Sequence, residues 1–204
     1  MSPTTRSIDA RGLPCPQPVI LARKALAEGG FDLLELRVDT PSAPENLVKF
    51  ATYAKCEVSL QEGAGETLVR ITPAGGAAPA CDITPELEAL SARRAAVVLI
   101  TAEGIGQGDA DLGRLLMKGF LYTLTESDHP PRTLLFMNGG VKLAVSGSPA
   151  LEHLKALAEG GTEVLSCGTC LDAYGLKESL AVGGVTNMYD IAAHLLEGPS
   201  LTLG

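Results

Sequence analysis

Several residue types that mark particular functions are scarce in this chain of 204 residues. Tryptophan is absent, and Phe and Tyr number four each, so the exposed rings on which single-stranded nucleic acid stacks are in short supply. Lys and Arg total 16 against 24 Asp and Glu, and the formal net charge of −8 argues against binding to a phosphate backbone or to an acidic membrane surface. We therefore expect neither nucleic acid nor a membrane among the partners.

Long apolar runs are missing as well. No run approaches the ~18–20 residues of a membrane helix, and the first residues lack the apolar segment of a secretory signal. The chain is 46% hydrophobic, which is ample for a buried core. We expect a soluble, cytoplasmic protein whose five cysteines are mostly reduced, so sulfur chemistry, redox work or metal binding are the functions to test.

The composition divides the chain at a segment rich in Pro, Ala and Gly, residues 73–85. The residues before it predict strands and helices in the order β-α-β-α-β-β, a two-layer α/β sandwich with both helices on one face. The predicted strands are 7–9, 33–39, 57–61 and 67–72, and the predicted helices are 16–28 and 43–55. We assign residues 1–73 to a first domain and 74–93 to a linker with a short helix over 86–93.

The second part, residues 94–204, alternates apolar strands with helices. The predicted strands are 95–101, 133–137, 163–166, 183–186 and 200–203, and the predicted helices are 109–126, 149–159, 171–180 and 188–197. Continuous apolar strands separated by helices are typical of a parallel sheet covered on both faces, a three-layer α/β/α domain. Helix 109–126 carries a broad apolar face, which indicates central packing or a subunit interface.

The first candidate site is the segment Gly12-Leu-Pro-Cys-Pro-Gln-Pro18. Pro16 suits the first turn of a helix, so Cys15 is predicted at or beside the helix N-cap. The partial positive charge there favours the thiolate, which is the reactive form of cysteine, and Arg11 is positioned to help. Arg23 is the only charge on the mostly apolar side of this helix. A buried, structural Cys15 is the alternative, which the two flanking prolines disfavour.

These residues carry a family resemblance. Asp9, Gly12, the Cys15-Pro16-x-Pro18 motif and Arg23 resemble the TusA/SirA-like family over residues 5–73. In that family the cysteine carries sulfur as a persulfide and hands it to the next protein. The resemblance implies the same role for Cys15, with Asp9, Arg11, Gly12, Pro16, Pro18 and Arg23 as motif and supporting residues.

The second candidate site is Cys167-Gly-Thr-Cys170, between a predicted strand and a predicted helix. A C-x-x-C pair at a helix start lowers the pKa of one thiol and supplies a resolving partner, so a dithiol/disulfide switch is reasonable. A zinc site needs four ligands, and His129, His153 and His194 are scattered. We therefore expect no metal and no cofactor.

Three glycine-rich segments, Gly104–Gly108, Asn138-Gly-Gly140 and Gly183-Gly184, are interpreted as turns. The last two follow or begin predicted strands and are also interpreted as lining for a pocket near Cys170.

The segment Cys167–Gly175 resembles the DsrE/DsrF family over residues 95–204. That family has a flavodoxin-like three-layer fold, takes part in sulfur relay and is commonly oligomeric. The resemblance implies that Cys170 is the reactive cysteine. Tyr174 stands where many members have Arg. Homo-oligomerisation through this domain is left open by the same resemblance.

The two domains in this order resemble the YedF-like proteins, which are sulfurtransferase-like and associated with selenium metabolism. Our leading hypothesis is a carrier of sulfur or selenium: Cys15 accepts it as a persulfide-type adduct and passes it to or from Cys170, and Cys167 resolves the adduct as a disulfide. Donor and acceptor proteins of sulfur or selenium are then the expected partners. The alternatives are a thiol-disulfide redox protein centred on Cys167 and Cys170, and a non-catalytic module that binds a sulfur-relay partner. Cys56 is interpreted as packing and Cys81 as incidental.

Overall fold

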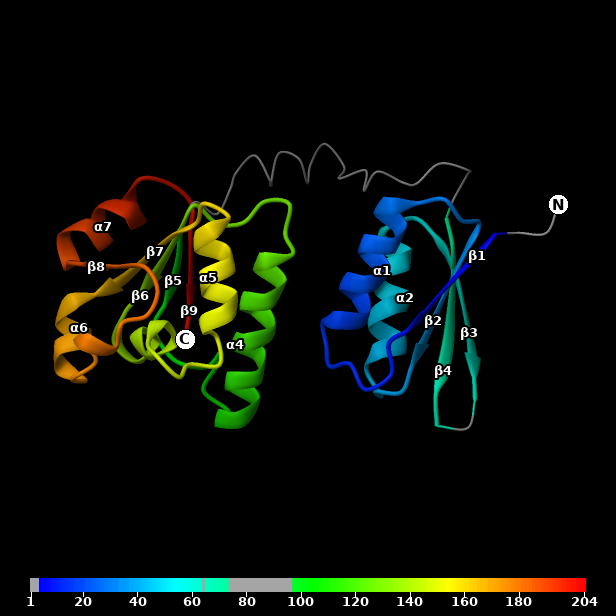
Figure 1. The fold of residues 1–204 in the computed structure, drawn as a ribbon, viewed down its shortest axis with the longest axis horizontal. Helices are drawn as coiled ribbons and strands as arrows, with labels where there is room; N and C mark the ends of the chain where they lie inside the picture. Colours follow the sequence, from blue (N-terminus) through cyan, green and yellow to red (C-terminus); the bar gives the residue numbers. More distant parts are fainter. Residues whose placement is uncertain (1–3, 64, 74–96) are drawn as a thin grey trace. The chain divides into compact units, whose positions relative to one another are not determined.

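Two separate sheets organise the chain, one before and one after the segment where the sequence predicts a linker (Figure 1). The computed structural model describes residues 4–63, 65–73 and 97–204. The predicted linker, the helix over 86–93 and Cys81 lie outside these residues, so the proposed domain boundaries stay a prediction. The fold class is confirmed, because each sheet is covered by helices in the predicted α/β manner.

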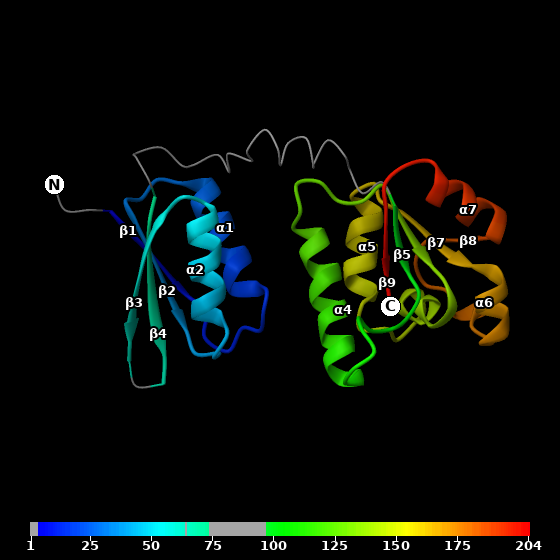
Figure 2. The same ribbon diagram turned by 180° about the vertical axis from the view of Figure 1, so that it is seen from behind.

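The N-terminal unit has a four-stranded sheet in the order β1-β2-β4-β3. Strands β1 and β2 are parallel, whereas β4 runs antiparallel to both β2 and β3. Both helices cover the same face of this sheet (Figures 1 and 2). The elements are β1 (Thr5–Asp9), α1 (Gln17–Glu28), β2 (Leu33–Val38), α2 (Ala43–Tyr53), β3 (Glu57–Glu62) and β4 (Thr67–Thr72).

Alternation of side chains along the strands explains this two-layer arrangement. In β2, Leu34, Leu36 and Val38 are fully buried under the helices, while the residues between them are half-buried or exposed. Helix α1 ends at Gly29, whose positive φ of 62° favours glycine. The sequence predicted this helix within one residue of its observed start.

The C-terminal unit has a five-stranded parallel sheet in the order β8-β7-β6-β5-β9. Helices α4 and α5 cover one face, and α6 and α7 cover the other (Figures 1 and 2). All four residues of β5 and of β6 are buried, as a sheet between two helical layers requires. The elements are β5 (Val97–Ile100), α4 (Ala110–Thr125), β6 (Thr133–Phe136), the 3₁₀ helix η1 (Asn138–Ala144), α5 (Leu151–Glu159), β7 (Glu163–Cys167), α6 (Gly168–Ala173), η2 (Lys177–Ser179), β8 (Gly184–Thr186), α7 (Met188–Leu196) and β9 (Ser200–Leu203).

Two predicted elements of this unit are wrong. The helix predicted over 171–180 is a short α6 that begins at Gly168 and ends before Gly175, whose φ of +64° breaks it. The residues Asn138-Gly-Gly140, interpreted as a turn, begin the 3₁₀ helix η1. Both differences change the position expected for Cys170. The sequence placed this residue before a helix, whereas in the structure it lies inside α6 and faces η1.

Helix α4 buries Gly113, Met117 and Leu121 against the sheet. Leu112, Leu115 and Leu116, which the sequence placed on the broad apolar face, are about half exposed, so central packing does not account for them. Among the described helices none combines the length and the apolar character that a membrane crossing requires.

Candidate functional site

Cys15 lies in the loop that joins β1 to α1, and its side chain is exposed. The helix begins at Gln17 with Pro16 as its N-cap residue, so Cys15 directly precedes the cap as predicted. Pro18, the other proline of the motif, is buried in the first turn of α1. Exposure to solvent is what a thiol that meets other proteins needs.

The amides of the first turn of α1 are largely committed within the turn. Pro16 and Pro18 have no N–H, and the N–H of Gln17 donates to the carbonyl of Pro14 at 3.0 Å. The N–H of Val19 donates to the carbonyl of Pro16 at 3.1 Å. The sulfur of Cys15 instead accepts a hydrogen bond from a side chain of the neighbouring helix.

That donor is Asn46 on α2, whose Nδ2 lies 3.8 Å from the Sγ of Cys15. Parallel strands β1 and β2 bring the starts of α1 and α2 to the same edge of the sheet. Thr40, Ser42 and Ala43, at the start of α2, line a small pocket together with Cys15. Two helix N-termini and an amide donor therefore surround a sulfur that would carry negative charge during transfer.

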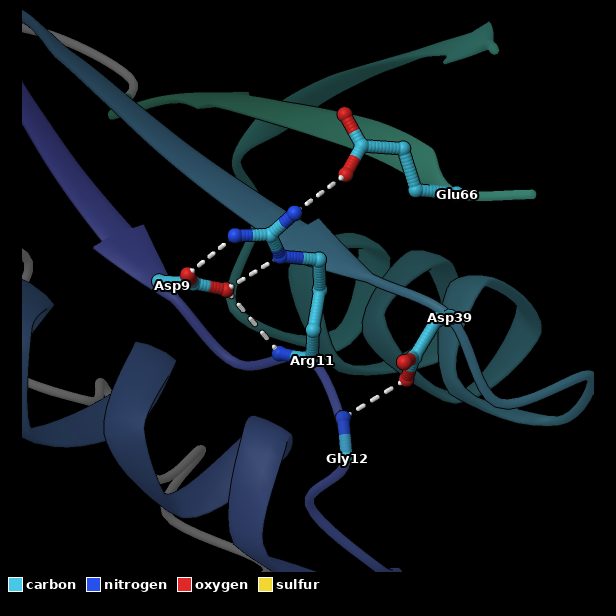
Figure 3. Close-up of polar contacts among 5 residues, drawn as sticks. All are labelled: Asp9, Arg11, Gly12, Asp39 and Glu66. Atoms are coloured by element: carbon cyan, nitrogen blue, oxygen red, sulfur yellow. Dashed lines mark hydrogen bonds and ion pairs between the residues drawn. The ribbon is translucent and has the colours of Figure 1, made fainter. Parts of the chain in front are cut away.

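The loop that carries Cys15 is held by a network of charged side chains (Figure 3). The guanidinium of Arg11 binds the carboxylate of Asp9 through two nitrogens, at 2.8 and 2.6 Å, and the carboxylate of Glu66 at 3.1 Å. The N–H of Gly12 donates to Asp39 at 2.7 Å. Gly12 has a φ of +71°, which is unfavourable for other residues, and this explains a glycine at this point of the motif.

This network has a clear electrostatic consequence. Hydrogen bonds from Arg11 lower the pKa of Asp9 from 3.8 to about 2. The hydrogen bond to Asp9 makes the largest contribution to raising the pKa of the Arg11 guanidinium above its ordinary value, and the negative charges of Asp9 and Glu66 add to it. The sequence suggested that Arg11 assists the thiolate, whereas the structure engages its guanidinium with Asp9 and Glu66, so its observed part is to hold the loop. Arg23 lies half-buried on α1.

Cys167 and Cys170 lie where strand β7 gives way to α6, at the carboxyl edge of the parallel sheet. Cys167 caps α6 and is 2% exposed, while Cys170 lies half-buried one turn further on. Asn138, at the end of β6, donates its backbone N–H to the Sγ of Cys170 at 3.1 Å. The predicted proximity of the Asn138-Gly-Gly segment to Cys170 is therefore confirmed.

The electrostatic environment of Cys170 differs from the expectation. Burial raises the pKa of the Cys170 thiol, and the neighbouring Cys167 adds to this effect, while the Asn138 amide opposes it. The sequence predicted a lowered pKa from a helix start. The prediction is wrong for Cys170 because α6 begins three residues earlier than expected and packs Cys170 against the apolar cores on both faces of the sheet.

Comparisons with known proteins place the first of these sites in a family. Residues 6–72 match the family model described as "Sulfurtransferase TusA". The chain belongs to the TusA family through this N-terminal unit. A SirA-like protein of Desulfitobacterium hafniense is 35% identical over 34% of this chain and 97% of its own, with a TM-score of 0.32.

Two solved structures resemble a larger share of the chain. The ychN protein of E. coli is 21% identical over 52% of this chain and 97% of its own, with a TM-score of 0.42. A protein of unknown function from Methanobacterium thermoautotrophicum is 18% identical over 52% of this chain and 96% of its own, with a TM-score of 0.41. The chain has no match among curated proteins.

Two contributors to the sites were not predicted from the sequence, because Asn46 and Glu66 contact the TusA-like loop from distant positions in the chain. Asn138 and Tyr174 stand in segments that the sequence singled out, but the hydrogen bond between them beside Cys170 was not predicted. The parallel pairing of β1 with β2 is the feature that brings the start of α2, and Asn46 with it, close to Cys15. Across the described parts of both units, no group of His, Cys, Asp and Glu side chains has the geometry to hold a metal ion.

Proposed function

We propose that the TusA-like unit is a sulfur carrier and that Cys15 is the residue that carries the sulfur. The supporting observation is the exposed sulfur of Cys15 at the meeting point of two helix N-termini, with the Asn46 amide as a donor. Membership of a sulfurtransferase family supports sulfur relay in general. The persulfide intermediate and the assignment of Cys15 are the proposal.

The transfer is a displacement without net oxidation. The Cys15 thiolate attacks the outer sulfur of a persulfide on the donor protein, and the donor's own thiolate leaves with the electron pair of the S–S bond. The product is a Cys15 persulfide. An acceptor thiolate then attacks the outer sulfur, and Cys15 leaves as thiolate, ready for another cycle. The Asn46 amide would stabilise the negative sulfur at both stages.

Cys170 is the proposed second carrier, acting in the same chemical way, and Cys167 is the proposed resolving thiol. Attack of the Cys167 thiolate on the Sγ of a Cys170 persulfide forms the Cys167–Cys170 disulfide and releases hydrosulfide. A dithiol reductant must then restore the pair. Cys167 is 2% exposed, which supports a role in which it reacts with Cys170 and not directly with another protein.

Mass spectrometry tests the role of Cys15 directly. The full chain is incubated with a cysteine desulfurase and cysteine, its thiols are trapped, and each cysteine peptide is quantified. We expect the Cys15 peptide to gain the mass of one sulfur, about 32 Da, in wild type, and Cys15→Ser to abolish acquisition of sulfur by Cys170 from the same donor. An unlabelled Cys15 peptide, with sulfur arriving elsewhere at the wild-type rate, contradicts the proposal. Omitting cysteine provides the control.

The same experiment distinguishes the cargo. The YedF-like combination of domains suggests selenium, which shares the nucleophilic chemistry of sulfur at a thiolate. Incubation with selenocysteine in place of cysteine gives an adduct with the isotope pattern of selenium. Sulfur is the cargo that the TusA family match supports, and preferential labelling by selenium would favour the alternative.

A thiol-disulfide redox protein is the second candidate, favoured by the contact between Cys167 and Cys170 at the start of α6. Such a protein would exchange electrons with a dithiol reductant at a rate unaffected by Cys15→Ser. The raised pKa of Cys170 does not separate the two candidates, because both need the Cys170 thiolate, so the comparison of wild type with Cys15→Ser decides between them.

A further inference from the structure

A chain of four contacts leads from solvent to the sulfur of Cys170. The ammonium of Lys142 pairs with Glu103 at 2.9 Å and lies 4.8 Å from the centre of the Tyr174 ring. The hydroxyl of Tyr174 donates to Oδ1 of Asn138 at 2.8 Å. The backbone N–H of Asn138 donates to the Sγ of Cys170 at 3.1 Å. The contacts join the loop after β5, η1 and the end of α6.

The backbone of Asn138 explains why this arrangement needs support. Its φ is +47°, in the left-handed region that non-glycine residues seldom adopt. Asparagine tolerates this region better than most residues, but the conformation persists only where the surroundings fix it. The bond from Tyr174 to the Asn138 side chain supplies such a restraint. The backbone N–H is aimed at Cys170 as a consequence of that conformation.

We propose that Tyr174 is a positioning residue for Cys170: its hydroxyl holds Asn138 in the left-handed turn that presents the Asn138 N–H to the sulfur. Lys142, fixed by Glu103, in turn holds the Tyr174 ring through a cation–π contact. This inference rests on the proposed role of Cys170 in sulfur exchange for its biological meaning. What it predicts physically is only how readily the Cys170 thiol ionises and reacts.

The electrostatics give the Asn138 N–H a defined effect. Burial raises the pKa of Cys170, and this hydrogen bond is the contribution that lowers it. Cys167, at the end of β7, acts on the Cys170 thiol directly. Tyr174, at the end of α6, and the Lys142–Glu103 pair are linked to the sulfur through Asn138. Lys142 keeps its charge because its hydrogen bond to Glu103 raises its pKa. Misplacing the Asn138 N–H should therefore leave the thiol harder to ionise.

Alkylation of the full chain by iodoacetamide, followed peptide by peptide across a pH series, measures this effect. In Tyr174→Phe we expect the midpoint for Cys170 to move to higher pH and the rate below the midpoint to fall roughly three- to tenfold, as the loss of one hydrogen bond predicts. Tyr189→Phe is the matched control, because it removes a phenol hydroxyl from a side chain of the same unit that is 83% exposed. Its Cys170 profile should equal that of wild type.

The Asn138→Gly background distinguishes a loss of positioning from a general destabilisation of the fold. Glycine adopts a positive φ without help from a side chain, so Asn138→Gly keeps the N–H while removing the group that Tyr174 binds. We expect Tyr174→Phe to have no further effect on Cys170 in the Asn138→Gly background. Continued protection of the buried Cys167 reports that each variant is folded.

Three results would overturn the proposal: a wild-type Cys170 profile in Tyr174→Phe, an equal loss in Tyr189→Phe, or an undiminished effect of Tyr174→Phe in the Asn138→Gly background. The alkylation experiment needs no sulfur donor. It therefore stands even if Cys15 acquires no persulfide, and the two proposals fail on different measurements.

Discussion

The side-chain amide of Asn46 lies 3.8 Å from the sulfur of Cys15, although 31 positions separate the two residues in the chain. The contact follows from topology: β1 and β2 are parallel, so the helices that follow them begin at the same edge of the sheet. The exposed thiol of the TusA-like unit thus has its donor on α2, while the prolines of α1 remove two amides from the first turn of its own helix.

Replacing Asn46 by alanine should slow the loading of Cys15. The lost donor stabilises negative charge on sulfur, and a hydrogen bond of this kind corresponds to a roughly two- to tenfold change in rate. The measurement is the initial rate at which the Cys15 peptide gains sulfur from a cysteine desulfurase. Thr52→Ala is a suitable control, because this exposed hydroxyl donates to the carbonyl of Val48 in its own helix. An unchanged rate in Asn46→Ala would remove Asn46 from the site.

The Asp9–Arg11 pair predicts a specific titration in acid. Arg11 lowers the pKa of Asp9 from 3.8 to about 2, so the folded state binds the proton less readily than the unfolded state. The contribution of the pair to stability is therefore complete above pH 3.8 and is lost as the pH falls towards 2. Carbon NMR of the Asp9 carboxyl should give a midpoint near 2 in the wild-type chain.

Arg11→Lys is the informative variant for this pair. Lysine keeps the positive charge but cannot bind both oxygens of Asp9 through a planar fork. We expect the Asp9 midpoint to rise towards 3.8 and the loading of Cys15 to slow several-fold, because the loop is less well held. A midpoint that stays near 2 would mean that charge alone, and not the two-point contact, sets the titration.

The sequence predicted most of the fold because the strands are short, apolar and clearly bounded. Alternation in Leu33–Val38 indicated a one-sided sheet, and the unbroken apolar run before Thr101 indicated a sheet covered on both faces. The prediction of a helix over 171–180 was wrong because nothing in the local sequence marks Gly175 as a helix end, since a glycine inside a helical pattern is tolerated. The start of η1 was missed because Asn-Gly-Gly is equally typical of a turn.

The sites were predictable only in part, for a different reason. Cys15 and its prolines form a local motif, and local motifs can be recognised in a sequence. The partners of that motif, Asn46 and Glu66, are set by strand pairing and come from 31 and 55 positions away. The raised pKa of Cys170 depends on burial between two apolar cores, and C-x-x-C spacing contains no information about burial.

Cys167→Ser should trap sulfur on Cys170. Serine cannot attack the Sγ of a Cys170 persulfide to form a disulfide, so the adduct should accumulate at least several-fold over wild type, with less hydrosulfide released. Peptide mass spectrometry with and without reductant measures both species. Cys56→Ser, which changes a buried cysteine of the other unit, is the control. Equal release of hydrosulfide from wild type and Cys167→Ser would refute a resolving role for Cys167.

Two adjacent glycines of η1 provide a matched test of how tightly the Cys170 site is built. A Cβ on Gly140 would lie 2.2 Å from the carbonyl oxygen of Ile100, in the interior strand β5, whereas a Cβ on Gly139 would meet its nearest atoms at an ordinary 3.7 Å. Because the obstacle at Gly140 is backbone, relief requires η1 to move away from the sheet. We expect Gly140→Ala to destabilise the C-terminal unit by about 2–4 kcal/mol and Gly139→Ala by less than about 1 kcal/mol.

The movement of η1 gives this prediction a second readout. Asn138 begins η1, so displacement of that helix should draw its N–H away from Cys170 and shift the alkylation midpoint of Cys170 to higher pH in folded Gly140→Ala. Denaturant unfolding measures the first effect and peptide-resolved alkylation the second. If Gly140→Ala is as stable as Gly139→Ala, then η1 can retreat from β5 without cost. In that case the position of the Asn138 amide is set by the bond from Tyr174 and not by the packing of η1 on the sheet.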